Sequence, residues 1–172
     1  ILGLGQLGLT TARLLRSFGY EVSGWSRTEK SIEGITCLLG EQGLKQIAAS
    51  SDYLVCLLPL TEDTKGILSR PLFEQMPGDA VLLNVARGEH LVEEDLLVAL
   101  SEKHLDFAYL DVFQTEPLPA EHSFWSFDKI QITPHVSAVT NIDTALTQIL
   151  DNYRRVKSGL AMVNVIDSRL GY

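Results

Sequence analysis

The feature of this sequence that most constrains its fold is the alternation of short apolar runs with segments of helical periodicity. The run Leu54–Leu58 is apolar throughout and stops at Pro59, as a strand covered on both faces would. Further strands are expected at residues 1–2, 20–25, 35–39, 80–85, 105–112 and 130–133. Helices are expected at residues 6–18, 41–50, 92–101 and 140–158. This order predicts an α/β fold in which helices flank a parallel sheet.

A glycine motif lies between the first expected strand and the first helix. Gly3, Gly5 and Gly8 fit the spacing G-x-G-x-x-G, which permits a tight turn, backbone approach to a pyrophosphate and close helix packing. Gln6 and Leu7 fall at the helix N-terminus, where free N–H groups and the helix dipole favour phosphate. The motif therefore predicts a doubly wound Rossmann-type sheet that binds a dinucleotide. Because only two residues precede Gly3, we also expect the chain to begin inside its first strand.

The end of the second expected strand indicates which dinucleotide binds. NAD enzymes usually place a carboxylate there, against the ribose 2′-hydroxyl. Here the strand at 20–25 is followed by Ser26, Arg27 and Thr28, and none of these is acidic. Hydroxyl groups can donate hydrogen bonds to a 2′-phosphate, and a guanidinium can clamp it. Arg27 alone is also compatible with a solvated loop residue, but the missing carboxylate favours NADP over NAD.

Three ionisable residues come just after three other strands. Arg87, Glu116 and His135 follow the strands expected to end at residues 85, 112 and 133. Ligands of such sheets bind outside the carboxyl ends of the strands. Taken singly, each residue is compatible with an ordinary surface position. Together they predict an acid–base site at one edge of the sheet.

Charge and cysteine content exclude several classes of partner. The chain has 14 Lys and Arg against 22 Asp and Glu, a net charge of -8. This balance argues against binding to nucleic acid or to an anionic membrane surface. No apolar stretch approaches the roughly 20 residues of a membrane span. Cys37 and Cys56 form no C-x-x-C pair and are expected to be buried thiols, as in the reducing cytoplasm.

The remaining histidines and one tryptophan carry no clear chemistry. His90, His104 and His122 stand in polar surroundings without the spacing of metal ligands, so we interpret them as surface residues. No metal site is expected. Trp125 is expected to pack a loop, with a place on the substrate side as the alternative.

Taken together, these motifs resemble the D-isomer-specific 2-hydroxyacid dehydrogenases, and within them the bacterial glyoxylate/hydroxypyruvate reductases. The resemblance covers essentially the whole chain. The matching segments are residues 3–8, 25–28, 84–88, 111–113, 116–119, 133–135 and the ending 169–172.

The resemblance implies a role for each ionisable residue. Arg87 would bind the substrate carboxylate and keto oxygen, which suits the rigid fork of a guanidinium. His135 would be the general acid that protonates the carbonyl oxygen. Glu116 would pair with His135, since a neighbouring carboxylate favours the protonated imidazole. Asp111 would hold the nicotinamide carboxamide. Further contacts to the cofactor would come from Leu58, Pro59, Thr64, Val85, Ala86, Ser137 and Ala138.

The resemblance also implies an oxidoreductase that uses NADPH to reduce a small 2-keto acid, glyoxylate or hydroxypyruvate, and that forms a homodimer. Residues 1–141 would be the dinucleotide-binding domain. Residues 142–172 would be a helix and tail that return to a substrate domain outside this chain. One alternative is a dinucleotide-sensing corepressor of the same fold, although no partner motif is evident. A methyltransferase with a similar glycine loop is the other, and the arginine–glutamate–histidine set argues against it.

Overall fold

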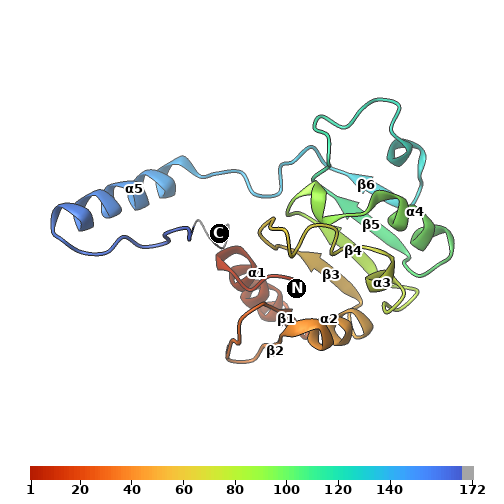
Figure 1. Cartoon of the computed structure of the whole chain (residues 1–172), viewed down its shortest axis with the longest axis horizontal. Helices are drawn as coiled ribbons and strands as arrows, with labels where there is room; N and C mark the ends of the chain where they lie inside the picture. The colour runs from red at the N-terminus through yellow and green to blue at the C-terminus, as the bar shows by residue number, and fades with distance from the viewer. Residues whose placement is uncertain (168–172) are drawn as a thin grey trace. The chain divides into compact units, whose positions relative to one another are not determined.

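The computed structural model describes residues 1–167. The chain divides into two compact units, Ile1–His135 and a second unit that begins at Val136 (Figure 1). The ending at 169–172, which contributes to the family resemblance, lies outside the described residues.

The first unit is built on a parallel sheet. Its strands are β1 (Ser23–Trp25), β2 (Thr36–Leu38), β3 (Tyr53–Cys56), β4 (Val81–Asn84), β5 (Phe107–Leu110) and β6 (Ile130–Ile132). β1 pairs with β2, and β3 to β6 pair in sequence order, every pair being parallel. Leu2 bridges Trp25 on one side and Cys56 on the other, both in parallel, and so joins the two groups. The resulting order, with the first segment between β1 and β3, is that of a doubly wound Rossmann sheet, as predicted.

Helices follow the strands in the predicted order. The α-helices are α1 (Gln6–Ser17), α2 (Gly40–Ala49), α3 (Arg70–Phe73), α4 (Glu93–Ser101) and α5 (Ile142–Lys157). Two 3₁₀ turns, η1 (Gly88–His90) and η2 (Ser123–Ser126), complete the described elements. The sequence patterns predict four of the α-helices to within about two residues, but they miss α3 and both 3₁₀ turns.

Alternate residues of the central strands pack on opposite faces of the sheet. Leu54 and Cys56 of β3 join the larger core, which also contains buried side chains of α2, α3 and α4. Val55 packs instead against the smaller cluster around Ala12 of α1. On that second face β5 is only partly covered, since its Tyr109 is 46% exposed. In β3, Tyr53 on the same face is 59% exposed. The expectation of strands covered on both faces therefore holds only in part for β3 and β5.

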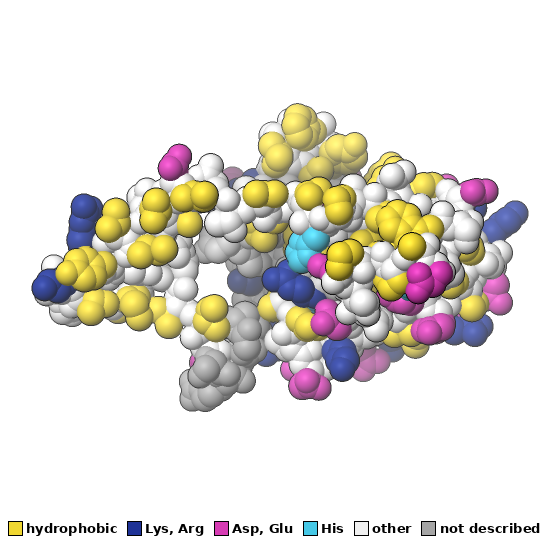
Figure 2. Space-filling view, turned by 90° about the horizontal axis from the view of Figure 1, so that it is seen from above, with side chains coloured by type: hydrophobic (Ala, Val, Ile, Leu, Met, Phe, Trp, Pro, Cys, Tyr) yellow, Lys and Arg dark blue, Asp and Glu magenta, His cyan; other side chains and the backbone are white. Residues whose placement is uncertain are grey.

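The second unit consists mainly of α5, and none of its helical residues is buried. Figure 2 shows apolar side chains, in yellow, on the surface of this unit, and those of α5 form part of them. These exposed apolar residues are Ile142, Leu146, Ile149, Leu150, Tyr153 and Val156. Among the described residues, no helix is long and apolar enough to cross a bilayer.

Candidate active site

The predicted acid–base residues lie beyond the carboxyl ends of three neighbouring strands. Arg87 follows β4, Glu116 lies in the loop after β5, and His135 follows β6. The strands pair in the order β4-β5-β6. Because all three run in parallel, the loops that follow them emerge at the same edge of the sheet.

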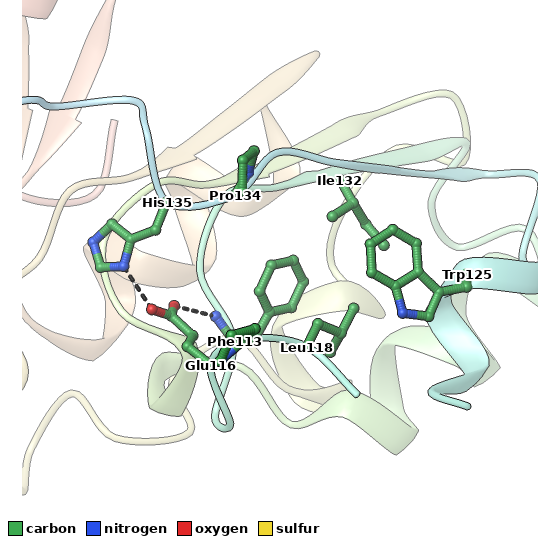
Figure 3. Close-up of a pocket in the computed structure, with 8 residues that line it drawn as sticks. Phe113, Glu116, Leu118, Trp125, Ile132, Pro134 and His135 are labelled. Carbon is green, nitrogen blue, oxygen red and sulfur yellow. Dashed lines mark hydrogen bonds and ion pairs between the residues drawn. The ribbon is translucent and has the colours of Figure 1, made fainter. Parts of the chain in front are cut away.

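His135 and Glu116 form a direct contact at this edge (Figure 3). His135 Nδ1 lies 2.7 Å from Glu116 Oε2, while Glu116 Oε1 accepts a 2.9 Å hydrogen bond from the Phe113 N–H. Both carboxylate oxygens are therefore engaged. The hydrogen bond to His135, followed by the Phe113 N–H and the charges of His135 and Arg87, lowers the pKa of Glu116 below its ordinary value despite partial desolvation.

The backbone at His135 fixes where its ring points. Its φ is +53°, in the left-handed region that few residues other than glycine adopt. The His135 N–H donates to the Asp111 carbonyl at 2.8 Å, which ties the end of β6 to the end of β5. With Nδ1 engaged by Glu116, the nitrogen on the far side of the ring, Nε2, is the one that can reach a substrate (Figure 3).

Arg87 is exposed and lies immediately before η1, as its N-cap. Its Nη1 donates to the Ala86 carbonyl at 2.6 Å, and its own carbonyl accepts from Asn84 Nδ2 at 3.0 Å. The guanidinium charge contributes to the lowered pKa of Glu116, so the two side chains sense each other electrostatically. The structure thus brings Arg87, Glu116 and His135 into one site.

An apolar pocket of about 400 Å³ adjoins the His135–Glu116 pair. Figure 3 shows it on the Glu116 side of the histidine ring, away from Nε2. Its lining comprises Phe113, Glu116, Pro117, Leu118, Trp125, Ile132, Pro134 and His135. Trp125 Nε1 donates to the Pro119 carbonyl at 2.8 Å. Trp125 therefore packs its loop, as expected, and also lines this pocket.

The glycine loop has the shape of a phosphate cradle. A Cβ at Gly8 would lie 1.8 Å from the Gly3 carbonyl oxygen, so only glycine fits where α1 passes the first strand. A Cβ at Gly5 would meet nothing within 4 Å. Gly5 is the N-cap of α1, and no side chain caps the helix there. The N–H groups of Gln6 and Leu7, in the first turn of α1, therefore border open space. A pyrophosphate bound there would accept their hydrogen bonds.

The turn after β1 contains no carboxylate among residues 26–28. Ser26 is buried, and its hydroxyl donates to the Thr28 carbonyl at 2.7 Å. Arg27 and Thr28 are exposed. The Ser26 hydroxyl thus shapes the turn, and the two residues after it are presented to solvent, where a 2′-phosphate could be reached.

The other residues expected to bind the cofactor lie after β3, β4 and β5 and in the second unit. Leu58 and Thr64 are buried, and Thr64 Oγ1 donates to the Pro59 carbonyl at 2.7 Å, which closes the loop after β3. Asp111 is 2% exposed and its carboxylate accepts a hydrogen bond from Thr133 Oγ1. Residues Val85 and Ala86 lie between β4 and Arg87. Ser137 and Ala138 belong to the second unit, so their place beside the cofactor stays a prediction.

The interpretation of His90 as a surface residue is wrong. Its side chain is 0% exposed and hydrogen-bonds on both sides. The two residues before it, Gly88 and Glu89, offer no sign of this burial, and the distant Leu68, which pairs with Leu91, also donates its N–H to the His90 carbonyl. A local pattern cannot detect such a tertiary contact. His90 is the residue of this site that the sequence reasoning missed.

The other two histidines lie nearer the surface. His104 is 3.6 Å from Glu102, with 41% of its side chain exposed. His122 is half-buried, lies 3.1 Å from Glu93 and stacks edge-on to Phe124, so it joins the loop to the start of α4. Within residues 1–167, no group of three potential metal ligands comes together.

Comparison with known proteins identifies the class. The NAD-binding domain model of the D-isomer-specific 2-hydroxyacid dehydrogenases matches residues 1–137, and the chain belongs to this family. Among curated relatives, the glyoxylate/hydroxypyruvate reductase A of Yersinia enterocolitica is 42% identical over the whole chain, which covers 55% of that protein. The enzyme of the same name from Photorhabdus laumondii is 44% identical, with the same coverage. The chain therefore spans about half the length of these relatives.

Solved structures give the same result. A D-isomer-specific 2-hydroxyacid dehydrogenase from Xanthobacter autotrophicus, in complex with NADPH and MES, matches 99% of this chain and 71% of its own, with a TM-score of 0.94 and 40% identity. The NADPH-dependent glyoxylate/hydroxypyruvate reductase of Sinorhizobium meliloti, in complex with NADP and sulfate, has a TM-score of 0.93 at 38% identity. The alignment covers 99% of this chain and 55% of that one.

Proposed function

We propose that this chain forms the cofactor half of an NADPH-dependent reductase that converts glyoxylate or hydroxypyruvate to the 2-hydroxy acid. The observation that carries the proposal is the 2.7 Å contact between His135 Nδ1 and Glu116 Oε2 beside Arg87, at the carboxyl edge of the sheet. The names of the similar reductases and the NADP complexes of the solved neighbours support it.

The glycine loop and the turn after β1 suit NADPH better than NADH. Gly5 leaves room for the pyrophosphate at the N-terminus of α1, and Arg27 with Thr28 would bind the 2′-phosphate. Ser26 would support them by shaping the turn. When bound, the reduced nicotinamide supplies a hydride. The residues proposed to line its site are Leu58, Pro59, Thr64, Val85, Ala86, Asp111, Ser137 and Ala138.

The protein side chains supply charge, orientation and a proton. The Arg87 guanidinium would hold the substrate carboxylate and polarise the keto oxygen. His135 would donate the proton on Nε2 to that oxygen as the keto carbon is reduced. Glu116 accepts the hydrogen on Nδ1, which orients the ring and leaves Nε2 for the substrate oxygen. Each group thereby has one role in a single reduction.

The rest of the enzyme would come from outside this chain. Because the curated relatives are nearly twice as long, we propose that residues 1–141 form the cofactor domain and that 142–172 pack on a substrate domain. The uncovered apolar face of α5 supports this arrangement. A homodimer in the cytoplasm is part of the same proposal, and Cys37 and Cys56, both free thiols, suit a reducing compartment.

The test is a screen of NADPH oxidation by the full-length protein with glyoxylate, hydroxypyruvate, pyruvate and bulkier 2-keto acids. We expect turnover with the two smallest polar substrates and much less with branched ones. The matched control is Arg87→Ala, which should raise KM and lower kcat because Arg87 would touch the substrate in both ground and transition states. No oxidation with any 2-keto acid, in a protein that binds NADPH, would contradict the proposal.

A further inference from the structure

His90 is a fully buried polar side chain to which the proposed reaction gives no role. It ends η1, three residues after Arg87, and its relative exposure is 0%. The backbone around it is fixed, because the His90 carbonyl accepts from the Leu68 N–H and the Glu89 carbonyl from the Gly66 N–H, both at 2.9 Å. The imidazole therefore occupies a defined place between the loops that follow β3 and β4.

The partners of the two ring nitrogens determine which one carries the hydrogen. Nε2 lies 3.3 Å from the Pro59 carbonyl oxygen, which can only accept, so Nε2 must be the donor. Nδ1 lies 3.2 Å from the Arg87 amide nitrogen, which can only donate, and 3.2 Å from the Arg87 carbonyl oxygen, which can only accept. That carbonyl already accepts from Asn84 Nδ2 at 3.0 Å. A neutral ring protonated on Nε2 makes two of these three hydrogen bonds, with the Pro59 carbonyl and the Arg87 N–H, whereas a ring protonated on Nδ1 makes only the one to the Arg87 carbonyl. Burial lowers the pKa of His90 and so favours this neutral form.

The two hydrogen bonds differ in how replaceable they are. The Pro59 carbonyl also accepts from Thr64 Oγ1, at 2.7 Å, and keeps a partner if the histidine is lost. The Arg87 N–H is held by Nδ1 of His90. That amide belongs to the residue whose guanidinium would bind the substrate. The ring therefore bears more on the placement of Arg87 than on the cofactor loop.

We infer that His90 is a positioning residue: through Nδ1 it fixes the backbone of Arg87, and through Nε2 it ties Arg87 to the Pro59 loop. The inference rests on the proposed function, since it assigns Arg87 to the substrate. The histidine touches neither substrate nor cofactor. It determines the position of the Arg87 backbone, from which the side chain extends. A displacement of that backbone would weaken the binding of a substrate carboxylate by the guanidinium.

Two substitutions separate the two hydrogen bonds. In His90→Asn the side-chain oxygen replaces Nδ1 and can still accept from Arg87, but nothing reaches Pro59. In His90→Gln the amide nitrogen replaces Nε2 and can still donate to Pro59, but Arg87 loses its acceptor. Steady-state kinetics of the full-length protein, the Kd of NADPH and the Tm are measured for each. His104→Gln, at a half-exposed histidine, is the matched control.

We expect His90→Gln to lower kcat/KM for the keto acid by about 5- to 100-fold, because the partly buried Arg87 N–H loses its acceptor, with an NADPH Kd within about twofold. His90→Asn should retain most of the wild-type value, and His104→Gln all of it. Equal kcat/KM in both His90 variants and the wild type, or a lower Tm with unchanged kinetics of the folded protein, would overturn the inference.

Failure of the inference and failure of the proposed function look different. If the wild type turns over no 2-keto acid, the proposed function falls and the kinetic role of His90 falls with it. If the wild type is active, the variants decide on His90 alone. Long-range ¹H–¹⁵N NMR of the imidazole adds a test that needs no activity: a hydrogen on Nδ1 instead of Nε2 would contradict the bridge.

Discussion

At the scale of single residues, His135 is restricted by its backbone conformation and by two hydrogen bonds. Its backbone has a φ of +53°, its N–H is bonded to Asp111, and its Nδ1 is bonded to Glu116. The left-handed region is sparsely populated by residues other than glycine, and a residue held there points to a functional constraint. This unfavourable backbone conformation is consistent with a ring whose Nε2 must point toward the substrate oxygen.

Replacing His135 by alanine should lower kcat of the full-length enzyme by about 10²- to 10⁴-fold, the usual contribution of a general acid. The Kd of NADPH should change by less than about twofold, because His135 would act on the substrate oxygen. Stopped-flow NADPH oxidation and a fluorescence titration measure the two quantities. Near-normal kcat in this variant would remove His135 from the proposed role.

Glu116 gives a prediction in pH. Its pKa is lowered in the folded protein, first by the hydrogen bond to His135, so its ionised form stabilises the fold. That stabilisation is present above the unfolded pKa, about 4.5, and is lost as the pH falls through the lower folded value. The Tm of Glu116→Gln should therefore lie below that of the wild type near pH 6, and the two should converge as the pH falls through the lowered pKa of Glu116. Parallel Tm curves over this range would contradict a stabilisation that depends on the ionisation of Glu116.

Arg27 tests the choice of cofactor. A charge-assisted contact to a 2′-phosphate is worth about 1.5–3 kcal/mol, or about ten- to a hundredfold in Kd. NADPH should therefore bind more tightly than NADH by that factor, and Arg27→Ala should remove most of the difference. Isothermal titration of both cofactors measures it, with Arg13→Ala, an arginine on α1 away from the turn, as the control. Equal Kd values for the two cofactors in the wild type would contradict NADP specificity.

At the scale of elements, the glycine loop between Leu2 and α1 tolerates few substitutions. Two glycines of the loop have opposite surroundings. Gly8 is pressed against the Gly3 carbonyl, while Gly5, with a φ of -75°, borders open space. The same substitution at these two positions therefore has different consequences.

Gly8→Ala should destabilise the fold, since overpacking costs about 1–3 kcal/mol, equivalent to a fall in Tm of about 2–12 °C for a chain of this size. Gly5→Ala should leave the Tm nearly unchanged, because its Cβ meets no atom, and should weaken NADPH binding at least tenfold by filling the pyrophosphate site. Differential scanning fluorimetry and titration separate the two effects. A Gly5→Ala protein with wild-type NADPH affinity would place the pyrophosphate elsewhere.

The elements that could be predicted are those with a periodic apolar pattern. The run at Leu54–Leu58 yields β3, and the pattern over 92–101 yields α4, whose first turn is acidic. α3 has only four residues, which is too short for a helical period to show. For α1 the helix is confirmed, but its buried residues are Gly8 and Ala12, whereas Leu7 is 59% exposed. Apolar character alone does not identify the packed face where the sheet requires small residues.

The same reasoning applies to the site. Arg87 and His135 could be predicted because each follows a recognisable strand, and parallel strands bring their ends together. His90 could not, because its burial depends on the bridge between Leu68 and Leu91, which no local pattern encodes. The polar neighbours of a histidine are a poor guide when a distant segment covers it.

At the scale of the whole molecule, the 172-residue chain contains the glycine loop and the sheet, and it spans 55% of its curated relatives. Its isolated form should therefore bind NADPH. It should reduce glyoxylate at only a small fraction of the full-length rate, because positioning and water exclusion contribute up to about 7–11 kcal/mol in ideal systems.

Both quantities can be measured on one preparation, with the full-length protein as the control and circular dichroism to show that the chain is folded. Full-length rates from residues 1–172 would mean that the substrate site is complete within them. A folded chain that binds no NADPH would instead contradict the proposed cofactor site.

The short segment before the glycine loop has a consequence for how the sheet opens. On one side the Ile1 carbonyl accepts from the Trp25 N–H, and on the other the Leu2 N–H donates to the Val55 carbonyl while the Leu2 carbonyl accepts from the Leu57 N–H. These two residues thus join the β1–β2 pair to the four strands β3 to β6. Amide exchange at Gly3, Trp25 and Leu57 should then proceed as one cooperative unit. Since the same segment leads into the phosphate cradle, a bound dinucleotide should slow the exchange of these amides together, including those that lie far from any phosphate.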